Sequence, residues 1–360
     1  MQSIIVLGGG MVGSAIARDL KESNFIVSIA DKDLNLKSKI ESFGINFKKI
    51  DFANKKEVFD IIENYDLVIG AVPGFLGRQV LGIVLNAKKN YVDISFMSED
   101  SKEFNDLAKK NELTVITDAG VAPGLSNLLY GRALSEYDVL TSANCYVGGL
   151  PQNPEPPWFY KSVFSPIDVV EEYTRPARFV KDGKLVVVPA MTDIETIKFE
   201  GVGELDAFNS DGLRSLIELP IPNMIEKTLR FPGHIQKIIK MRDEGMFEEG
   251  IISRTASDLI AQWAPSDLDY DQTVLRLEFN GTKNGKEKSE VYNLIDYFDK
   301  NKKISSMART TGYTCSATAR LILEGSFSEK GIFNLETLGL DNSLVDSILL
   351  YLSDRNIQFN

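Results

Sequence analysis

The stretch that decides the fold reads Ile4-Ile5-Val6-Leu7-Gly8-Gly9-Gly10-Met11-Val12-Gly13-Ser14-Ala15-Ile16-Ala17. An apolar run typical of a strand is followed by glycines and then by a helical pattern. Gly8 permits a tight turn, Gly10 has no side chain to block a pyrophosphate, and Gly13 lets the helix pack closely on the strand. The spacing therefore predicts a dinucleotide-binding turn at a helix N-terminus, because the amides there attract phosphate. Its expected contact residues are Gly8, Gly10, Met11, Val12 and Gly13.

An acidic residue stands where this kind of turn needs one. Asp31 follows the apolar run Phe25–Ala30 and lies 18 residues beyond Gly13, near the usual spacing of about 20. A carboxylate there accepts hydrogen bonds from the adenosine ribose and repels a 2′-phosphate, which favours NAD over NADP. Lys32 would partly reverse that preference, so NADP stays open. The alternative is a glycine turn that serves packing alone.

Other residues follow predicted strands at the same edge of the sheet. Ligands of parallel sheets bind outside the carboxyl ends of the strands. Asp51 follows a short apolar segment and either approaches the adenine or caps the next helix. Asp93 stands at the end of Tyr91-Val92-Asp93 and either faces the cofactor or caps a turn. The further expected cofactor contacts are Asp51, Ala71, Val72, Pro73 and Asp93.

Residues 3 to 127 alternate strand-like and helical segments. This alternation predicts βαβ units, right-handed crossovers and a doubly wound parallel sheet of Rossmann type. The expected strands are Ser3–Leu7, Phe25–Ala30, Leu67–Ala71, Tyr91–Ile94 and Thr114–Thr117. The expected helices are Met11–Glu22, Lys55–Asn64, Gly77–Ala87 and Glu99–Lys110.

After Asn127 the pattern predicts an α+β domain with an antiparallel or mixed sheet. A loop is expected over 148–157, and a hairpin connection over 280–285. The expected strands are Asn144–Val147, Phe179–Val180, Leu185–Val188, Thr196–Glu200, Thr273–Asn280 and Lys288–Leu294. The expected helices are Leu128–Leu134, Asp168–Tyr173, Asp211–Leu216, Ile235–Glu244, Ser253–Trp263, Thr310–Leu323 and Asp341–Asp354.

The composition narrows the class of protein. Hydrophobic residues make up 43% and charged residues 25%, as in globular proteins, and the net charge is −11. A nucleic-acid partner is not expected because no basic surface is indicated. No apolar run approaches the length of a membrane span, and no leader is recognised, so a cytoplasmic protein is expected. Two distant cysteines and one histidine give no metal-binding spacing, so no metal is expected.

Several blocks together resemble the saccharopine dehydrogenase family. The first is Thr117-Asp118-Ala119-Gly120-Val121-Ala122-Pro123-Gly124-Leu125-Ser126-Asn127, and the second is Tyr146-Val147-Gly148-Gly149-Leu150-Pro151. Further blocks are Ala207–Ser215, Thr228–His234 and Met307–Tyr313. The resemblance covers essentially the whole chain, in order. Within the family the chain is most similar to the compact L-lysine 6-dehydrogenase branch.

The resemblance implies fold, activity and assembly. It implies a Rossmann domain over 1–127 that is completed by 310–360, and an α+β substrate and dimerisation domain over 128–309. It implies NAD(P)-dependent oxidation of an amine carbon in a lysine-like amino acid, by a homodimer. The first alternative is a saccharopine- or carboxynorspermidine-type dehydrogenase or reductase. An alternative of another class is a dinucleotide-binding redox sensor without catalysis.

Three residues are candidates for the proton transfer that must accompany hydride transfer. Asp118 stands at the end of the expected strand Thr114–Thr117 and either meets the reacting amine or stabilises a loop. His234 is the only histidine, and its ordinary pKa lies nearest neutrality. Lys161 acts as a base if it is desolvated, and is otherwise a solvated surface residue.

Arginine is the residue that best binds the carboxylate of an amino-acid substrate, because its guanidinium donates two parallel hydrogen bonds. Arg214, Arg230 and Arg175 are the candidates, and each alternatively bridges parts of the protein. Gly148 and Gly149 either let the backbone approach the substrate or form a plain turn.

Overall fold

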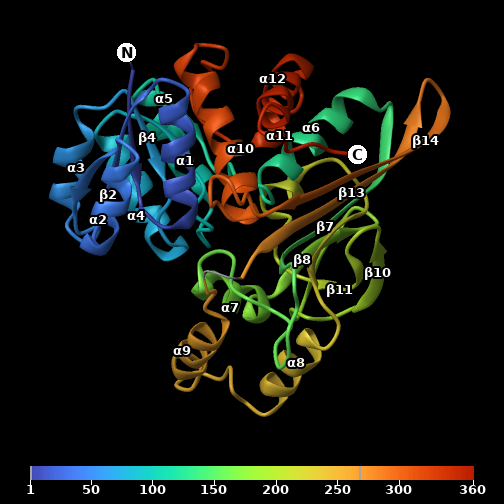
Figure 1. The fold of residues 1–360 in the computed structure, drawn as a ribbon. Coiled ribbons are helices and arrows are strands. Elements are labelled where there is room, and N and C mark those ends of the chain that lie inside the picture. The colour runs from blue at the N-terminus through green and yellow to red at the C-terminus, as the bar shows by residue number, and fades with distance from the viewer. Residues whose placement is uncertain (1, 267–268) are drawn as a thin grey trace. The chain divides into compact units, whose positions relative to one another are not determined.

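The computed structural model describes residues 2–266 and 269–360, and the chain forms two compact units (Figure 1). The first unit consists of Met1–Arg132 and Ala308–Asn356, and the second of Ala133–Met307 and Ile357–Asn360. The chain passes from one unit to the other within helices α6 (Leu125–Glu136) and α10 (Ser306–Leu323), and again after Asn356.

The first unit contains a parallel sheet with the strand order β15-β6-β5-β4-β1-β2-β3. Its strands are β1 (Ser3–Leu7), β2 (Ile26–Asp31), β3 (Asn46–Lys49), β4 (Leu67–Gly70), β5 (Asn90–Asp93), β6 (Thr114–Ile116) and β15 (Gly331–Phe333). The chain runs from β1 outward to β3, and then returns to β4 on the other side of β1. At such a reversal the loops that follow β1 and β4 diverge and open a crevice for ligands.

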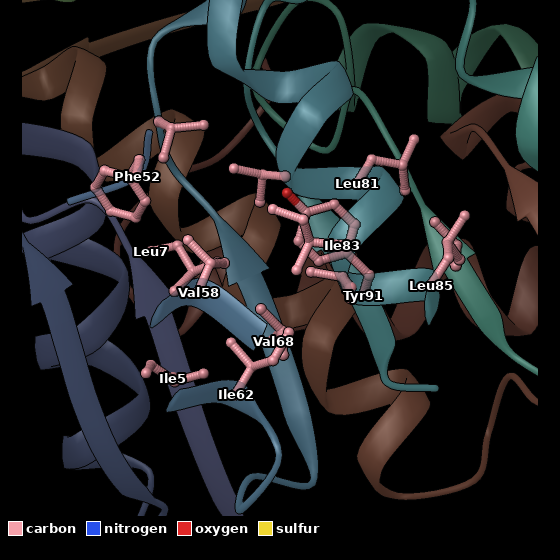
Figure 2. Packing of buried hydrophobic residues seen from close by; sticks show 14 of the residues in the cluster. Ile5, Leu7, Phe52, Val58, Ile62, Val68, Leu81, Ile83, Leu85 and Tyr91 are labelled. Atoms are coloured by element: carbon pink, nitrogen blue, oxygen red, sulfur yellow. The ribbon is translucent and has the colours of Figure 1, made fainter. Parts of the chain in front are cut away.

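Both faces of this sheet are covered, as the doubly wound pattern predicts. Ile5 and Leu7 of β1 belong to a buried cluster with Val58 of α3 and Leu81 of α4 (Figure 2). The alternate residues of β1, such as Ile4, are buried too. The near-continuous apolar run of β1 is typical of strands buried on both faces. The helices of this part are α1 (Met11–Glu22), α2 (Lys37–Ser42), α3 (Lys55–Ile62), α4 (Gly74–Asn86) and α5 (Asn105–Lys110).

The C-terminal segment returns to the first unit. Strand β15 pairs in parallel with β6 at the edge of the sheet. Asp19 of α1 accepts hydrogen bonds from the Tyr351 hydroxyl at 2.7 Å and from Nε of Arg355 at 2.5 Å. The predicted return is thereby confirmed, and its helices are α10, α11 (Leu335–Leu338) and α12 (Asn342–Ser353).

The second unit is built on a mixed sheet with the order β10-β11-β12-β7-β13-β14, to which β8 and β9 are added beside β12. Strands β12 and β7 run parallel, whereas the other neighbours run antiparallel. The strands are β7 (Val139–Pro151), β8 (Ala177–Lys181), β9 (Lys184–Val188), β10 (Glu195–Phe199), β11 (Gly203–Asn209), β12 (Met224–Arg230), β13 (Asp271–Lys283) and β14 (Lys286–Tyr297). The helices are α7 (Pro166–Thr174), α8 (His234–Asp243) and α9 (Ile252–Trp263). The predicted α+β class is confirmed.

The expected loop at Gly148 is wrong, because β7 continues through Gly148 and Gly149 to Pro151. A Cβ atom on Gly148 would lie 2.7 Å from the carbonyl oxygen of Leu229, and one on Gly149 would lie 2.3 Å from Val163. The glycines are therefore explained by close packing inside a strand, not by a turn.

Two strands of the second unit were not predicted. Strands β11 and β12 contain charged residues at positions that the fold buries, so their sequences did not show an apolar alternation. The expected helix over Asp211–Leu216 is also wrong, because a 3-10 turn forms instead at Arg214–Glu218. The hairpin connection expected over 280–285 is a two-residue turn at Asn284-Gly285, because the two strands extend to Lys283 and Lys286. Both turn residues adopt positive φ, as such a turn requires.

Across the described residues, no helix combines the length and the apolar character that crossing a membrane demands.

Candidate functional site

The three glycines of the N-terminal turn differ in what surrounds them. Gly8 has a φ of +111°, and a Cβ atom there would lie 2.2 Å from the carbonyl oxygen of Ala71. A Cβ atom on Gly13 would lie 2.1 Å from the carbonyl oxygen of Gly8. By contrast, no atom lies within 4 Å of a Cβ placed on Gly10. Gly8 and Gly13 are thus required by the packing of the protein itself, whereas Gly10 faces open space.

The first turn of α1 is open to an anion. Gly10 is the N-cap residue and has no side chain to bond the free amides, and no acidic residue stands in the first turn. Met11 at the start of the helix is half exposed. Free amides at a helix N-terminus, with the positive end of the helix dipole, bind phosphate groups. The space at Gly10 and these amides fit the pyrophosphate of a dinucleotide.

Asp31 links the end of β2 to the glycine turn. Its Oδ2 atom accepts a hydrogen bond from the amide of Gly9 at 2.6 Å, and its Oδ1 atom accepts one from the amide of Asp33 at 2.8 Å. The carboxylate therefore holds the turn in place. Its predicted contact with the ribose stays a prediction.

Ala71, Val72 and Pro73 connect β4 to α4 at the switch point of the sheet. The amide of Ala71 donates to the carbonyl of Leu7 at 2.8 Å, so this loop starts beside the glycine turn. Asp51 does not cap the next helix, because Asn54 is the N-cap residue of α3. The Asp51 carboxylate accepts from the amide of Ala53 at 3.0 Å.

Two acidic residues lie at the carboxyl ends of neighbouring strands of the first unit, Asp93 as the last residue of β5 and Asp118 two residues after β6. The Asp93 carboxylate is fully buried and accepts from the Tyr91 hydroxyl at 2.7 Å and the Ser95 hydroxyl at 2.5 Å. Burial raises the pKa of Asp93 to about 7, and the charge of nearby Asp118 adds to the rise. Asp118 is itself buried, in a left-handed backbone conformation with φ of 55°. Such a conformation is uncommon outside glycine and occurs often at functional sites.

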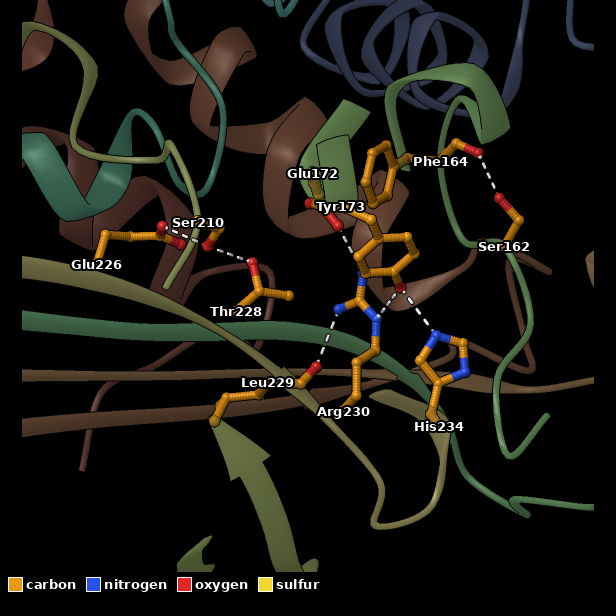
Figure 3. Close-up of polar contacts among 10 residues, drawn as sticks. All are labelled: Ser162, Phe164, Glu172, Tyr173, Ser210, Glu226, Thr228, Leu229, Arg230 and His234. Atoms are coloured by element: carbon orange, nitrogen blue, oxygen red, sulfur yellow. Dashed lines mark hydrogen bonds and ion pairs between the residues drawn. The ribbon is translucent and has the colours of Figure 1, made fainter. Parts of the chain in front are cut away.

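A row of buried polar residues lies along one face of β12 in the second unit (Figure 3). Glu226, Thr228 and Arg230 alternate along the strand, so their side chains point to the same face. Sequence reasoning proposed only Arg230 for a site. The period-two spacing of the three residues is the signal that could have revealed the row.

Arg230 is 1% exposed, and each of its three side-chain nitrogen atoms donates a hydrogen bond. Its Nη2 atom donates to Glu172 at 2.6 Å, its Nε to the Tyr173 hydroxyl at 3.0 Å, and its Nη1 to the carbonyl of Leu229 at 2.9 Å. Burial raises the pKa of Glu172, and the charge of Arg230 opposes that rise. Because each of its three side-chain nitrogen atoms already donates to the protein, this geometry favours a structural role for Arg230 over direct binding of a substrate carboxylate.

His234 lies in a buried aromatic group with Trp158, Tyr160, Tyr173 and Trp263. Its Nδ1 atom lies 2.8 Å from the carbonyl oxygen of Trp158, and its Nε2 atom lies 2.9 Å from the Tyr173 hydroxyl. Burial, helped by the charge of Arg230, lowers the pKa of His234 to about 3. A neutral, fully bonded imidazole is a poor proton carrier near neutral pH, so the geometry favours a structural role.

Glu226 stands at the other end of the row. Its Oε2 atom accepts from the Ser210 hydroxyl at 2.7 Å and from the amide of Gly212 at 3.1 Å. The Ser210 hydroxyl is also 2.7 Å from that of Thr228. Burial raises the pKa of Glu226 to about 8, although the hydrogen bond from Ser210 opposes the rise.

The remaining sequence candidates are dispersed over the second unit. Lys161 is a third exposed and forms an ion pair with Asp269 at 3.7 Å. Arg175 pairs with Glu171 one helical turn earlier. Arg214 begins the 3-10 turn with a φ of 54°. Their predicted roles in catalysis or substrate binding stay predictions.

In the part of the chain that the structure describes, no group of three or more histidine, cysteine, aspartate or glutamate side chains is arranged to hold a metal ion.

Comparison with protein families gives two consecutive matches. Residues 4–116 match the saccharopine dehydrogenase NADP binding domain, and residues 120–357 match the saccharopine dehydrogenase C-terminal domain.

Individual relatives agree with these matches. The chain is 26% identical over 264 residues to the saccharopine dehydrogenase (NADP(+), L-glutamate-forming) of Pyricularia oryzae. That match covers 69% of this chain and 58% of the fungal protein. It is 24% identical over 392 residues to the carboxynorspermidine synthase of Vibrio cholerae, covering 94% of this chain and 93% of the relative.

The fold also matches a solved structure along its whole length. The apo L-Glu-forming saccharopine dehydrogenase of Saccharomyces cerevisiae superposes with a TM-score of 0.81 and 19% sequence identity. The superposition covers 100% of this chain and 99% of that structure.

Proposed function

Because the chain belongs to the saccharopine dehydrogenase family, we propose that it is an NAD(P)-dependent oxidoreductase of saccharopine or carboxynorspermidine type. In the proposed reaction a carbon bonded to nitrogen gains or loses a hydride, so that an imine and a secondary amine interconvert. The observation that carries the proposal is the open space at Gly10 beside the uncapped start of α1.

The first unit holds the dinucleotide in this proposal. The free amides that follow Gly10 bind the pyrophosphate, and Asp31 orients the glycine turn and bonds the ribose. A bound nicotinamide dinucleotide supplies or accepts the hydride. The acid at Asp31 favours NAD, whereas the matched family domain is named for NADP, so both cofactors belong in any assay.

Asp118 is the residue that we assign to proton transfer. Reduction of an imine adds a proton to nitrogen, and the reverse reaction must remove one before hydride leaves. Asp118 follows β6 at the carboxyl edge of the sheet, where ligands of this fold bind. Its neighbour Asp93 is buried and proton-binding near neutral pH. His234 is enclosed and Lys161 is paired on the surface, which leaves Asp118 as the best placed of the three candidates.

The comparisons favour this reaction type over oxidation of lysine alone. The matched part of the fungal saccharopine dehydrogenase is 58% of that protein, while the match to the bacterial carboxynorspermidine synthase spans nearly all of both chains. The more specific expectation of an L-lysine 6-dehydrogenase remains a prediction, as does the homodimer.

A substrate panel tests the proposal. Saccharopine, carboxynorspermidine, L-lysine, ornithine and diamines are each offered with NAD and with NADP, and absorbance of the reduced nicotinamide is followed. Turnover of saccharopine or carboxynorspermidine in preference to lysine supports the proposed type. Turnover of lysine alone would instead support the lysine 6-dehydrogenase. Dinucleotide binding without turnover of any substrate would favour the non-catalytic sensor.

A further inference from the structure

Glu226 is a buried carboxyl group without a basic partner among the described residues. Its side chain lies on a central strand of the second sheet, and the residue is 6% exposed. Its hydrogen bonds from Ser210 and Gly212 both reach Oε2, which leaves Oε1 without a donor in the described part of the chain. A buried carboxylate is costly unless it is paired, so such a group holds either a proton or a cation.

The neighbouring charges do not neutralise Glu226. Asp211 pairs with Arg178 through two hydrogen bonds at 2.7 and 3.1 Å. Glu172 pairs with Arg230. Each of these arginines is thus matched by its own carboxylate, and both carboxylates repel a negative charge on Glu226.

Lys227, the residue that follows Glu226 in the sequence, forms its ion pairs with other carboxylates. Lys227 points to the opposite face of β12, because side chains alternate along a strand. Its ammonium group lies 2.9 Å from Asp193 and 2.8 Å from Glu195. On the face of Glu226, the residue opposite on β7 is Cys145, whose buried thiol carries no positive charge.

The surroundings of Glu226 are preformed and polar. A Cβ atom on Gly212 would lie 2.2 Å from the Glu226 carboxyl carbon, so glycine there leaves room for the carboxyl group. When Ser210 donates to Glu226, the Thr228 hydroxyl donates to Ser210, and the three groups form one ordered chain (Figure 3). The arrangement orients the carboxyl group, and no basic residue in the described part of the chain is paired with it to balance its charge once its proton leaves.

We propose that Glu226 binds a primary ammonium group of the substrate. The ammonium replaces the proton that Glu226 holds in the free protein, and it bonds the unpartnered Oε1 atom. The raised pKa of Glu226 agrees with this exchange, because such a group is largely protonated until a cation arrives. The inference rests on the proposed function, since an amine substrate brings the cation.

The test is a calorimetric titration of 1,5-diaminopentane and of L-lysine into the full chain with bound dinucleotide. Three variants are compared with the wild type. Glu226→Gln removes the charge at nearly constant shape, and Glu226→Asp keeps the charge. Glu278→Gln is the matched control, because Glu278 lies two strands away on the other face of the same sheet. Near-UV circular dichroism and urea unfolding report whether each variant is folded.

The expected result is a roughly 10- to 100-fold weaker binding of both probes by Glu226→Gln, as for loss of a hydrogen bond to a charged group. Glu226→Asp recovers part of the affinity, and Glu278→Gln binds like the wild type. At pH 7 the wild type releases a proton on binding, which appears as a heat that depends on the ionisation enthalpy of the buffer. Glu226→Gln releases none.

Two outcomes overturn the inference: equal binding by the wild type and Glu226→Gln, or no binding of either probe to the wild type. The proposed function is judged separately, by nicotinamide absorbance on the same samples. Undiminished turnover in Glu226→Gln contradicts the role of Glu226 but supports the proposed function. Binding that depends on Glu226, without turnover of any amine, supports the role of Glu226 but contradicts the proposed function.

Discussion

The Tyr173 hydroxyl lies 2.9 Å from Nε2 of His234, and the partner of the other ring nitrogen decides which of the two groups donates. Nδ1 of His234 faces the carbonyl oxygen of Trp158, which can only accept, so Nδ1 carries the ring proton. Nε2 of the neutral ring is then an acceptor, and the Tyr173 hydroxyl donates to it. Nε of Arg230 in turn donates to the Tyr173 oxygen. One hydroxyl thus satisfies a buried histidine and a buried arginine.

Tyr173→Phe is expected to destabilise the second unit. Removing the hydroxyl leaves Nε2 of His234 and Nε of Arg230 unsatisfied, at about 1–3 kcal/mol for each buried group. Urea unfolding measures the loss in free energy of unfolding. Tyr297→Phe serves as the control, because Tyr297 is half exposed. A loss for Tyr173→Phe no larger than that of the control would contradict the assigned network.

The neutral state of His234 predicts a pH dependence of stability. The unfolded histidine binds a proton below pH 6.5, whereas the folded one does not until about pH 3, so stability from this residue is lost as pH falls through that window. The raised pKa values of Asp93 and Glu226 make stability change with pH in the opposite direction. Because both groups are present in the wild type and in a His234→Gln variant, their contribution cancels when the two proteins are compared. The stability advantage of the wild type over this variant should shrink by about 1.4 kcal/mol from pH 7.5 to 5.5. A constant difference would mean that His234 is not held neutral.

Two glycines of the N-terminal turn allow an effect on packing to be distinguished from an effect on ligand binding. Gly10→Ala should change the free energy of unfolding by less than about 0.5 kcal/mol, because its Cβ atom meets no protein atom. It should weaken dinucleotide binding by roughly tenfold or more, about 1.4 kcal/mol. Gly13→Ala is the matched comparison and should destabilise the fold by about 1–3 kcal/mol, since its Cβ atom would overlap the Gly8 carbonyl. Full dinucleotide affinity in Gly10→Ala would contradict the assigned pyrophosphate position.

The glycine turn and the parallel sheet were predictable because their signals are local. A strand, a turn and a helix follow one another within Ile4–Ala17, and the apolar runs have the expected periods. Strand β12 was not predicted because Glu226, Thr228 and Arg230 are polar residues, which the fold buries and bonds to other polar groups. The contact of Tyr173 with His234 joins residues 61 positions apart, so no local pattern could indicate it. For the same reason the sequence favoured His234 as a proton carrier, whereas its surroundings enclose it.

Asp118→Asn is expected to lower kcat more than it raises KM, if the carboxylate acts mainly in the transition state. The amide keeps the size of the side chain but accepts no proton. Steady-state rates with the best substrate of the panel measure both constants, and Asp60→Asn on the exposed side of α3 is the control. An unchanged kcat in Asp118→Asn would contradict the role of Asp118 in proton transfer.

The most direct test of the proposed chemistry follows the hydride itself. NADH and NADPH that carry deuterium at the transferable position are incubated with the enzyme, an amino-acid amine and a carbonyl partner, and the product is examined by mass spectrometry. Hydride transfer to an imine predicts a secondary amine with one deuterium on the carbon next to its nitrogen. Oxidation of the labelled cofactor with no deuterium in any amine product would contradict the account.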